Sequence, residues 1–145
     1  MMTSFKNEKD RQEMLEALGK NMNEEFRATL QYICHRILSQ DHNPVLAESF
    51  KSAALDEMAH ILFFSDLITK YGGKPLLTDW EVDRSSDCKE MLTKNIALEQ
   101  AAKTRYAAQV ERFKDYAEFS TVIKSVLSDE EDHEDKFTAY LKASP

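Results

Sequence analysis

The chain contains two short stretches of the same form, Asp56-Glu57-Met58-Ala59-His60 and Asp129-Glu130-Glu131-Asp132-His133, each with a glutamate three positions before a histidine. A single glutamate precedes each stretch at almost the same distance. Glu25 lies 32 positions before Glu57, and Glu99 lies 31 positions before Glu130. Because residues three apart share one face of an α-helix, the Glu and His of each stretch can point in the same direction. The chain is therefore predicted to contain two copies of one helical unit.

Long helical segments surround these stretches. Over about 11–38, apolar residues recur at helical spacing and are predicted to form one buried stripe: Leu15, Leu18, Met22, Phe26, Thr29, Ile33 and Ile37. A second helix is predicted over 44–71, with Asn43 as its cap and Pro44 at its first position. Further helices are predicted over 88–114 and, after a break at 115–120, to the C-terminus.

The length and the few turn residues fit one all-helical domain over residues 1–145. The chain has only three Gly and three Pro in 145 residues, which leaves few connections. The segment 72–87 lacks helical periodicity and is longer than adjacent antiparallel helices need. Extended at about 3.3 Å per residue, it can cross the whole bundle. We predict an all-α four-helix bundle of two antiparallel hairpins, joined by this long crossover.

Charge and composition exclude several classes of protein. The net charge of −7 argues against a nucleic-acid partner, and no apolar run reaches the roughly 18 residues of a membrane span. The N-terminus lacks a signal-peptide pattern. Cys34 and Cys88 are far apart, so neither a disulfide framework nor a cysteine metal site is indicated. These features favour the cytoplasm.

The repeated unit places four carboxylates and two imidazoles at one level of the bundle. With a rise of about 1.5 Å per residue, each antiparallel hairpin brings its two glutamates to the same height. Carboxylate oxygens and imidazole nitrogens suit iron or manganese, so we predict two metal ions per chain. Their ligands are Glu25 with His60 for one ion, Glu99 with His133 for the other, and Glu57 with Glu130 as bridges. Coordination positions stay open for oxygen or peroxide.

The alternative is that these residues are ordinary charges on helix surfaces. Fifteen of the 145 residues are Glu, so a Glu three positions before a given His occurs about one time in ten. Two such pairs with matching upstream glutamates are far rarer. Tyr32 and Tyr106 occupy matching positions in the two units. Either they pack in the core, or they contact a ligand carboxylate or pass an electron to the metals. Phe64 and Phe137 are predicted to pack above the centre.

Two other pairs complete the set of candidates. Asp56 and Asp129 either hold the second nitrogen of a histidine or are solvated. His35 and His42 lack the pattern and are predicted to lie on the surface.

With these motifs in view, the chain resembles the bacterioferritins and, more loosely, the rubrerythrins of the ferritin-like superfamily. The resemblance rests on the two Asp-Glu-x-x-His stretches and on the segment 25–32, Glu-Phe-Arg-Ala-Thr-Leu-Gln-Tyr. It implies a ferroxidase-type di-iron oxidoreductase that oxidises Fe(II) with oxygen or hydrogen peroxide, in iron storage or iron detoxification. The alternative that it implies is a rubrerythrin-like protein that reduces peroxide without a rubredoxin domain.

The resemblance also bears on haem and on assembly. Met58 occupies the place of the methionine that binds haem between two bacterioferritin subunits, although a methionine at helical spacing more often serves packing. Only 12 residues follow His133, so we expect the short fifth helix of ferritin cages to be missing. We expect a homo-oligomer, either a dimer or a larger assembly.

Overall fold

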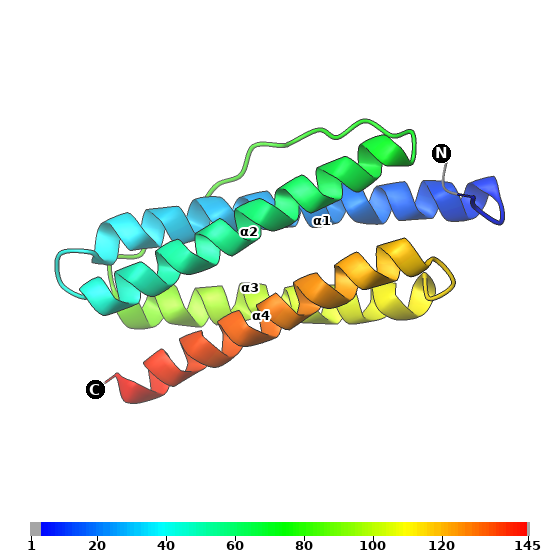
Figure 1. The fold of residues 1–145 in the computed structure, drawn as a ribbon. Helices are drawn as coiled ribbons and strands as arrows, with labels where there is room; N and C mark the ends of the chain where they lie inside the picture. The colour runs from blue at the N-terminus through cyan, green and yellow to red at the C-terminus, as the bar shows by residue number, and fades with distance from the viewer. Residues whose placement is uncertain (1–3, 145) are drawn as a thin grey trace.

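Residues 4–144 are described by a computed structural model, in which four long helices run side by side (Figure 1). The helices are α1 (Glu8–Ser39), α2 (Pro44–Lys70), α3 (Cys88–Arg112) and α4 (Ala117–Ala143). No strand occurs in the described part of the chain. None of the helices in that part is long and apolar enough to cross a membrane. The predicted all-α four-helix bundle is confirmed.

The caps explain where the helices begin. Asn43 caps α2 as predicted, since its Oδ1 accepts from the backbone N–H of Leu46 at 3.2 Å, and Pro44 follows it. The prediction for α1 started too late. Asn7 caps that helix by accepting from the backbone N–H of Asp10 at 2.8 Å, one turn earlier than expected. The start of α4 at Ala117 was also missed, because no side-chain cap marks it in the sequence.

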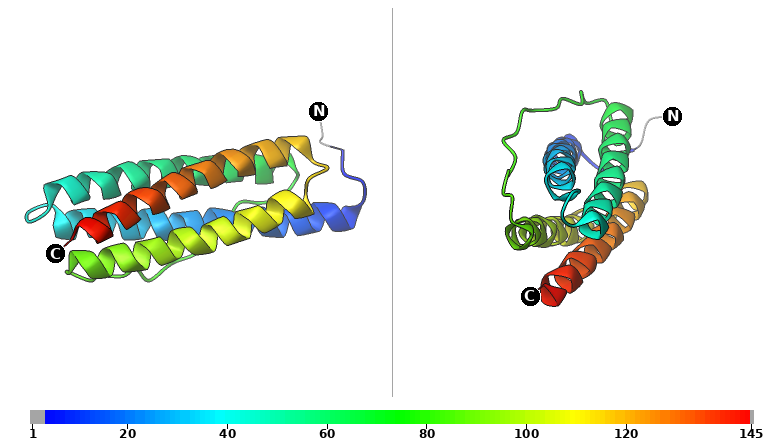
Figure 2. Two further views of the ribbon diagram at one scale, coloured as in Figure 1. Left: turned by 90° about the horizontal axis from the view of Figure 1, so that it is seen from below. Right: turned by 90° about the vertical axis from the view of Figure 1, so that its left-hand side faces the viewer.

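The four helices form two antiparallel hairpins, α1 with α2 and α3 with α4. The segment from Gly72 to Asp87 carries the chain along the outside of α1, from the end of α2 to the start of α3 (Figures 1 and 2). Consequently α2 and α3 run in the same direction, and the long crossover is confirmed. Between the hairpins, α1 packs against α3 and α2 packs against α4.

Polar side chains of α1 fasten the crossover to the bundle. Asn23 accepts from the backbone N–H of Thr78 at 2.7 Å, and its Nδ2 donates to the carbonyl of Leu76 at 3.0 Å. Farther along, the Arg27 guanidinium lies 5.1 Å from the ring centroid of Trp80. The crossover therefore has a fixed path over the outer face of α1.

Two apolar clusters fill the bundle above and below a polar middle layer. One cluster lies toward the start of α1 and includes Met14, Leu18, Phe64, Tyr106, Phe119 and Ile123. The other lies toward the turn between α1 and α2 and includes Leu46, Phe50, Met91, Tyr32 and Phe137. The bundle therefore holds its middle layer between two packed hydrophobic regions.

The predicted apolar stripe of the first helix was wrong in its C-terminal half. Ile33 and Ile37 are 45% and 55% exposed, whereas Tyr32 and His35 face the interior and are completely buried. The apolar pattern marks two faces here, and hydrophobicity alone does not tell which one packs inside.

Candidate metal centre

The middle layer of the bundle consists of the six residues that the sequence singled out. Each helix supplies one glutamate, and α2 and α4 add the histidines; all six side chains are at most 4% exposed. Their ligand-type atoms form two overlapping groups, each within 4.8 Å. One group is Glu25, Glu57, His60 and Glu130, and the other is Glu57, Glu99, Glu130 and His133. The shared glutamates are the two that were predicted to bridge.

Both histidines turn the same ring nitrogen toward the centre. His60 Nδ1 lies 3.4 Å from Glu25 and from Glu130, while His133 Nδ1 lies 3.0 Å from Glu57. Because each Glu-His pair is three residues apart on its helix, the two side chains of a pair share the inner face. The two Nδ1 atoms are therefore available as ligands.

The outer nitrogens of the histidines are held by aspartates from the opposite hairpin. His60 Nε2 lies 2.7 Å from Asp129 Oδ2, and His133 Nε2 lies 2.9 Å from Asp56 Oδ2. A carboxylate at Nε2 keeps the proton on that nitrogen and leaves the Nδ1 lone pair facing inward. The interpretation of Asp56 and Asp129 as partners of the histidines is confirmed, and the crossed pairing adds a contact between α2 and α4.

The two tyrosines also reach across the hairpins. The Tyr106 hydroxyl donates to Glu25 Oε1 at 2.5 Å, and the Tyr32 hydroxyl donates to Glu99 Oε1. Burial and the neighbouring glutamate charges raise both tyrosine pKa values well above the usual range, so each keeps its proton and stays a donor. The tyrosines thus orient one oxygen of each outer glutamate.

The buried charges explain why this centre suits cations. Burial raises the pKa of Glu57 and Glu130 well above the usual range, and the charges of Glu25 and Glu99 add to the rise. Burial lowers the pKa of His133, but the hydrogen bond and charge of Glu99 raise it to about 9. Without a cation, protons must offset the clustered carboxylates.

Unpaired atoms at the centre fit the same conclusion. Among the described residues, eight buried side-chain atoms lack a hydrogen-bond partner, and six belong to the centre: Glu57 Oε1 and Oε2, Glu99 Oε2, Glu130 Oε1, and Nδ1 of His60 and His133. Buried polar atoms are normally satisfied. An oxygen and nitrogen donor set of this kind fits two ions such as iron or manganese.

Sequence reasoning missed two amide clamps that flank the centre between α1 and α3. On one side, Asn21 and Gln109 exchange two hydrogen bonds of 2.6 and 2.8 Å. On the other side, Asn95 accepts from Gln31 at 2.6 Å and bonds His35 Nδ1 at 2.8 Å. Asn21 and Asn95 are 74 positions apart, as are Glu25 and Glu99, so the internal repeat carried a signal for these clamps.

His35 is a correction to the sequence prediction. It was expected on the surface, yet it is completely buried, with Nε2 2.9 Å from Asp83 Oδ2 in the crossover. Burial lowers the pKa of His35 despite that carboxylate. Its partners hold the crossover against the bundle, and it takes no part in the centre. His42 is exposed, as predicted.

Two other predictions concern residues near the centre. Phe64 and Phe137 are 0% and 1% exposed and pack in the two apolar clusters, which confirms their predicted role. Met58 lies outside the centre and is 48% exposed, on the surface formed by α1 and α2.

Comparison with known proteins shows which family and which solved structures this chain resembles. Residues 15–144 match the family Ferritin-like domain. The chain is similar to a ferritin-like, diiron-carboxylate protein of Bacillus anthracis, with 25% identity, a TM-score of 0.84, and coverage of 91% of this chain and 97% of that one. No match was found among curated proteins.

More distant structures share the fold. A dodecameric thioferritin of Bacteroides fragilis is 21% identical with a TM-score of 0.85, over 92% of this chain and 86% of that chain. A bacterioferritin of Desulfovibrio desulfuricans, described with a diiron site, is 20% identical with a TM-score of 0.87, over 96% and 84%. The fold and the buried carboxylate–histidine layer define a ferritin-like four-helix bundle. The chain belongs to the ferritin-like domain family.

Proposed function

We propose that the protein is a ferroxidase-type oxidoreductase that binds two Fe(II) ions per chain and oxidises them with hydrogen peroxide or oxygen. The observation that carries the proposal is the pair of overlapping ligand groups, which share Glu57 and Glu130 and leave six buried ligand-type atoms without hydrogen bonds. The family and the diiron relatives support it. Glu25 with His60 and Glu99 with His133 are the proposed separate ligands of the two ions.

The proposed reaction balances with two iron ions. Two Fe(II) lose one electron each to O2, which leaves with two protons as H2O2. Alternatively they give both electrons to H2O2, whose O–O bond breaks, and two protons complete two water molecules. Throughout, Tyr32 and Tyr106 keep the outer glutamates oriented. Asp56 and Asp129 hold the protons at the outer histidine nitrogens.

A second candidate reaction uses the same centre for peroxide reduction, with the iron recycled by an electron donor. The same ligand set also accepts manganese. Turnover with peroxide and a reductant separates this role from net iron oxidation, and metal analysis of the native protein separates iron from manganese. Iron storage and iron detoxification are both served by the proposed oxidation.

The test is rapid mixing of the anaerobic Fe(II)-loaded protein with each oxidant, followed by near-ultraviolet absorption. The wild type should oxidise two Fe(II) per chain in a fast phase. Glu57→Ala and His133→Ala should abolish that phase, whereas Glu131→Ala, which removes an exposed neighbour of Glu130, should preserve it. If Glu57→Ala and His133→Ala keep the wild-type rate, the assignment is wrong.

We also propose that the chain forms a homo-oligomer through the outer face of α1 and α2. This face exposes large apolar side chains, namely Ile33, Ile37, Leu55, Met58, Leu62 and Phe63, at 45–58%. Four of them, Ile33, Ile37, Leu55 and Met58, line one open pocket, and exposed apolar patches often mark an interface. The dodecameric thioferritin of Bacteroides fragilis, a structural relative, supports the proposal. Light scattering tests it, and Leu62→Lys should shift the protein toward the monomer.

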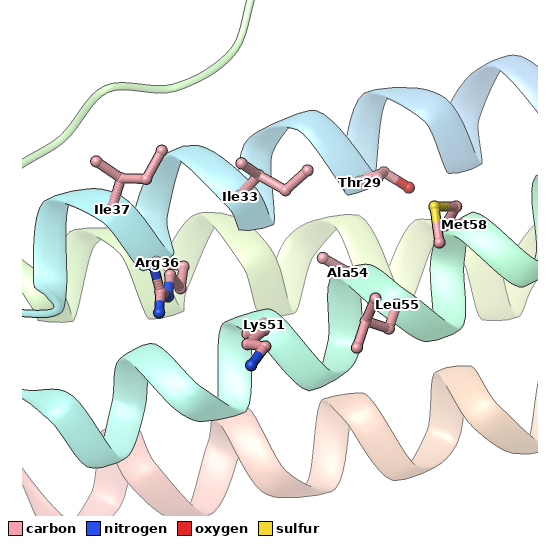
Figure 3. Close-up of a pocket in the computed structure, with 8 residues that line it drawn as sticks. All are labelled: Thr29, Ile33, Arg36, Ile37, Lys51, Ala54, Leu55 and Met58. Carbon is pink, nitrogen blue, oxygen red and sulfur yellow. The ribbon is translucent and has the colours of Figure 1, made fainter.

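We further propose that haem binds on this outer face, between two copies of the chain. A cavity of about 320 Å³ lies beside Met58, with apolar walls that include Ile33 and Leu55 and with the cations Arg36 and Lys51 (Figure 3). Met58 would hold the iron of a haem through its thioether, and the cations would face its carboxylates. A bound haem would supply one-electron transfer. Titration of the protein with haem, compared with Met58→Leu, tests this part through the Soret absorption.

A further inference from the structure

A cavity of about 60 Å³ leads to the centre between α1 and α3. Its inner end is formed by all four glutamates of the centre, and neither histidine lines it. Its walls come from α1 and α3 and include Ala28, Leu98 and Ala102. At the outer end lie Ala101, which is exposed, and Arg27, whose side chain is 37% exposed. The cavity thus joins the surface to the side of the centre that carries only carboxylates.

The opposite side of the centre is closed by hydrogen-bonded side chains. His60 from α2 and His133 from α4 occupy it, and their outer nitrogens are bonded to Asp129 and Asp56. A small molecule that arrives there meets imidazole rings held in place. A molecule that arrives between α1 and α3 meets the four glutamates of the centre. The two sides of the centre therefore differ in access.

The size of the cavity limits what can use it. One water molecule needs about 10–15 Å³ of such volume, so 60 Å³ holds about four to six. Oxygen and hydrogen peroxide fit in this space, whereas an organic substrate does not.

Arg27 lines the outer end of the cavity, and Trp80 lies behind it, outside the lining. Arg27 Nε is buried and has no hydrogen-bond partner among the described residues, and the same holds for Trp80 Nε1. Trp80 packs on the Arg27 guanidinium at 5.1 Å, and Glu24 lies 3.7 Å from Arg27 Nη1. Arg105 adds a second positive charge to the lining. Hydrogen peroxide can accept a hydrogen bond from a guanidinium N–H, whereas O2 is a poor acceptor.

We propose that this cavity is the route by which hydrogen peroxide reaches the centre, and that Arg27 binds it at the outer end. The proposal rests on the proposed function and names the preferred oxidant. Peroxide that passes Arg27 takes one electron from each of two Fe(II), its O–O bond breaks, and two protons complete two waters. Trp80 positions the guanidinium and links this route to the crossover.

The first test separates the two oxidants with Arg27→Gln. Fe(II)-loaded protein is mixed with H2O2 or with O2 in separate stopped-flow experiments. The second-order rate constant with H2O2 should fall about tenfold, as expected for one lost hydrogen bond to a charged donor, and that with O2 should change less than about twofold. Arg84→Gln, which removes an exposed charge from the crossover, is the matched control and should leave both rates unchanged. An equal change with both oxidants, or no change, overturns the role of Arg27.

The second test needs no iron chemistry. Ala101→Phe places a ring at the outer end of the cavity, whereas Ala107→Phe adds the same ring at another exposed position of α3. Azide binding to the cobalt(II)-loaded protein is followed by visible absorption. Ala101→Phe should slow azide association at least about tenfold without changing cobalt uptake, and Ala107→Phe should match the wild type. Azide association at the wild-type rate in Ala101→Phe overturns the route.

The two tests also separate failure of the route from failure of the proposed function. If the wild type oxidises no Fe(II) with either oxidant, the proposed function is wrong, although azide still reports on the cavity. If the wild type oxidises iron and both variants behave as wild type, only the route is wrong.

Discussion

Asp129→Asn should weaken one of the two metal sites selectively. Asp129 Oδ2 lies 2.7 Å from His60 Nε2, so its charge keeps the proton there and strengthens Nδ1 as a ligand. Loss of such a partner typically lowers metal affinity 10- to 100-fold. Because the Asp129 side chain is 44% exposed, water screens its charge, and we expect the lower end of that range. The expected loss is about tenfold, or about 1.4 kcal/mol.

Calorimetric titration of the metal-free protein with cobalt(II) resolves this effect. The ligand group around His60 should bind about tenfold more weakly in Asp129→Asn, while the group around His133 keeps its affinity. Asp56→Asn should give the reverse pattern, because Asp56 holds His133. Asp66→Asn removes an exposed charge from α2 and serves as the control. If Asp129→Asn behaves like this control, or weakens both sites equally, the crossed pairing does not tune the ligands.

Three further predictions concern the metal-free protein. Tyr106→Phe removes a buried donor to Glu25 and should lower the free energy of unfolding in urea by about 2 kcal/mol; a loss below about 0.5 kcal/mol contradicts the hydrogen bond. Phe50→Ala, at a completely buried position, should cost about 3–5 kcal/mol in the same assay, and a loss under about 1 kcal/mol would show that the site is not packed. Burial lowers the pKa of His35 in the folded state below its usual value of about 6.5, so the unfolded chain binds a proton that the folded chain resists. The free energy of unfolding should therefore fall as the pH drops below about 6.5. His35→Gln should remove the part of this decrease that comes from protonation of His35. If the difference in unfolding free energy between variant and wild type stays constant from about pH 7.5 to 5, the prediction is contradicted.

The positions of the six central residues could be predicted because helix geometry leaves little freedom. Glu25 and Glu57 flank one turn at nearly equal distances, and an antiparallel hairpin must then bring them to one level. The same holds for Glu99 and Glu130. The internal repeat made the prediction stronger, because the same spacing of glutamates occurs in both hairpins.

Contacts between hairpins could not be predicted in the same way. Asp56 directly precedes Glu57 in the chain, but the packing of α2 against α4 decides that it holds His133 rather than His60. His35 was misplaced because its burial depends on Asp83, which lies 48 positions away in a crossover without periodicity. Such contacts depend on how the helices and the crossover pack against one another. The spacing of residues along one helix carries no information about this packing.

The number of metal ions bound per chain tests the central claim most directly. Anaerobic titration with Fe(II) should saturate at two ions per chain in the wild type, and Glu57→Ala should disturb both ions, because both ligand groups contain Glu57. Saturation at one ion or none would contradict the account of two overlapping ligand groups. Two ions bound with unchanged affinity in Glu57→Ala would contradict it as well.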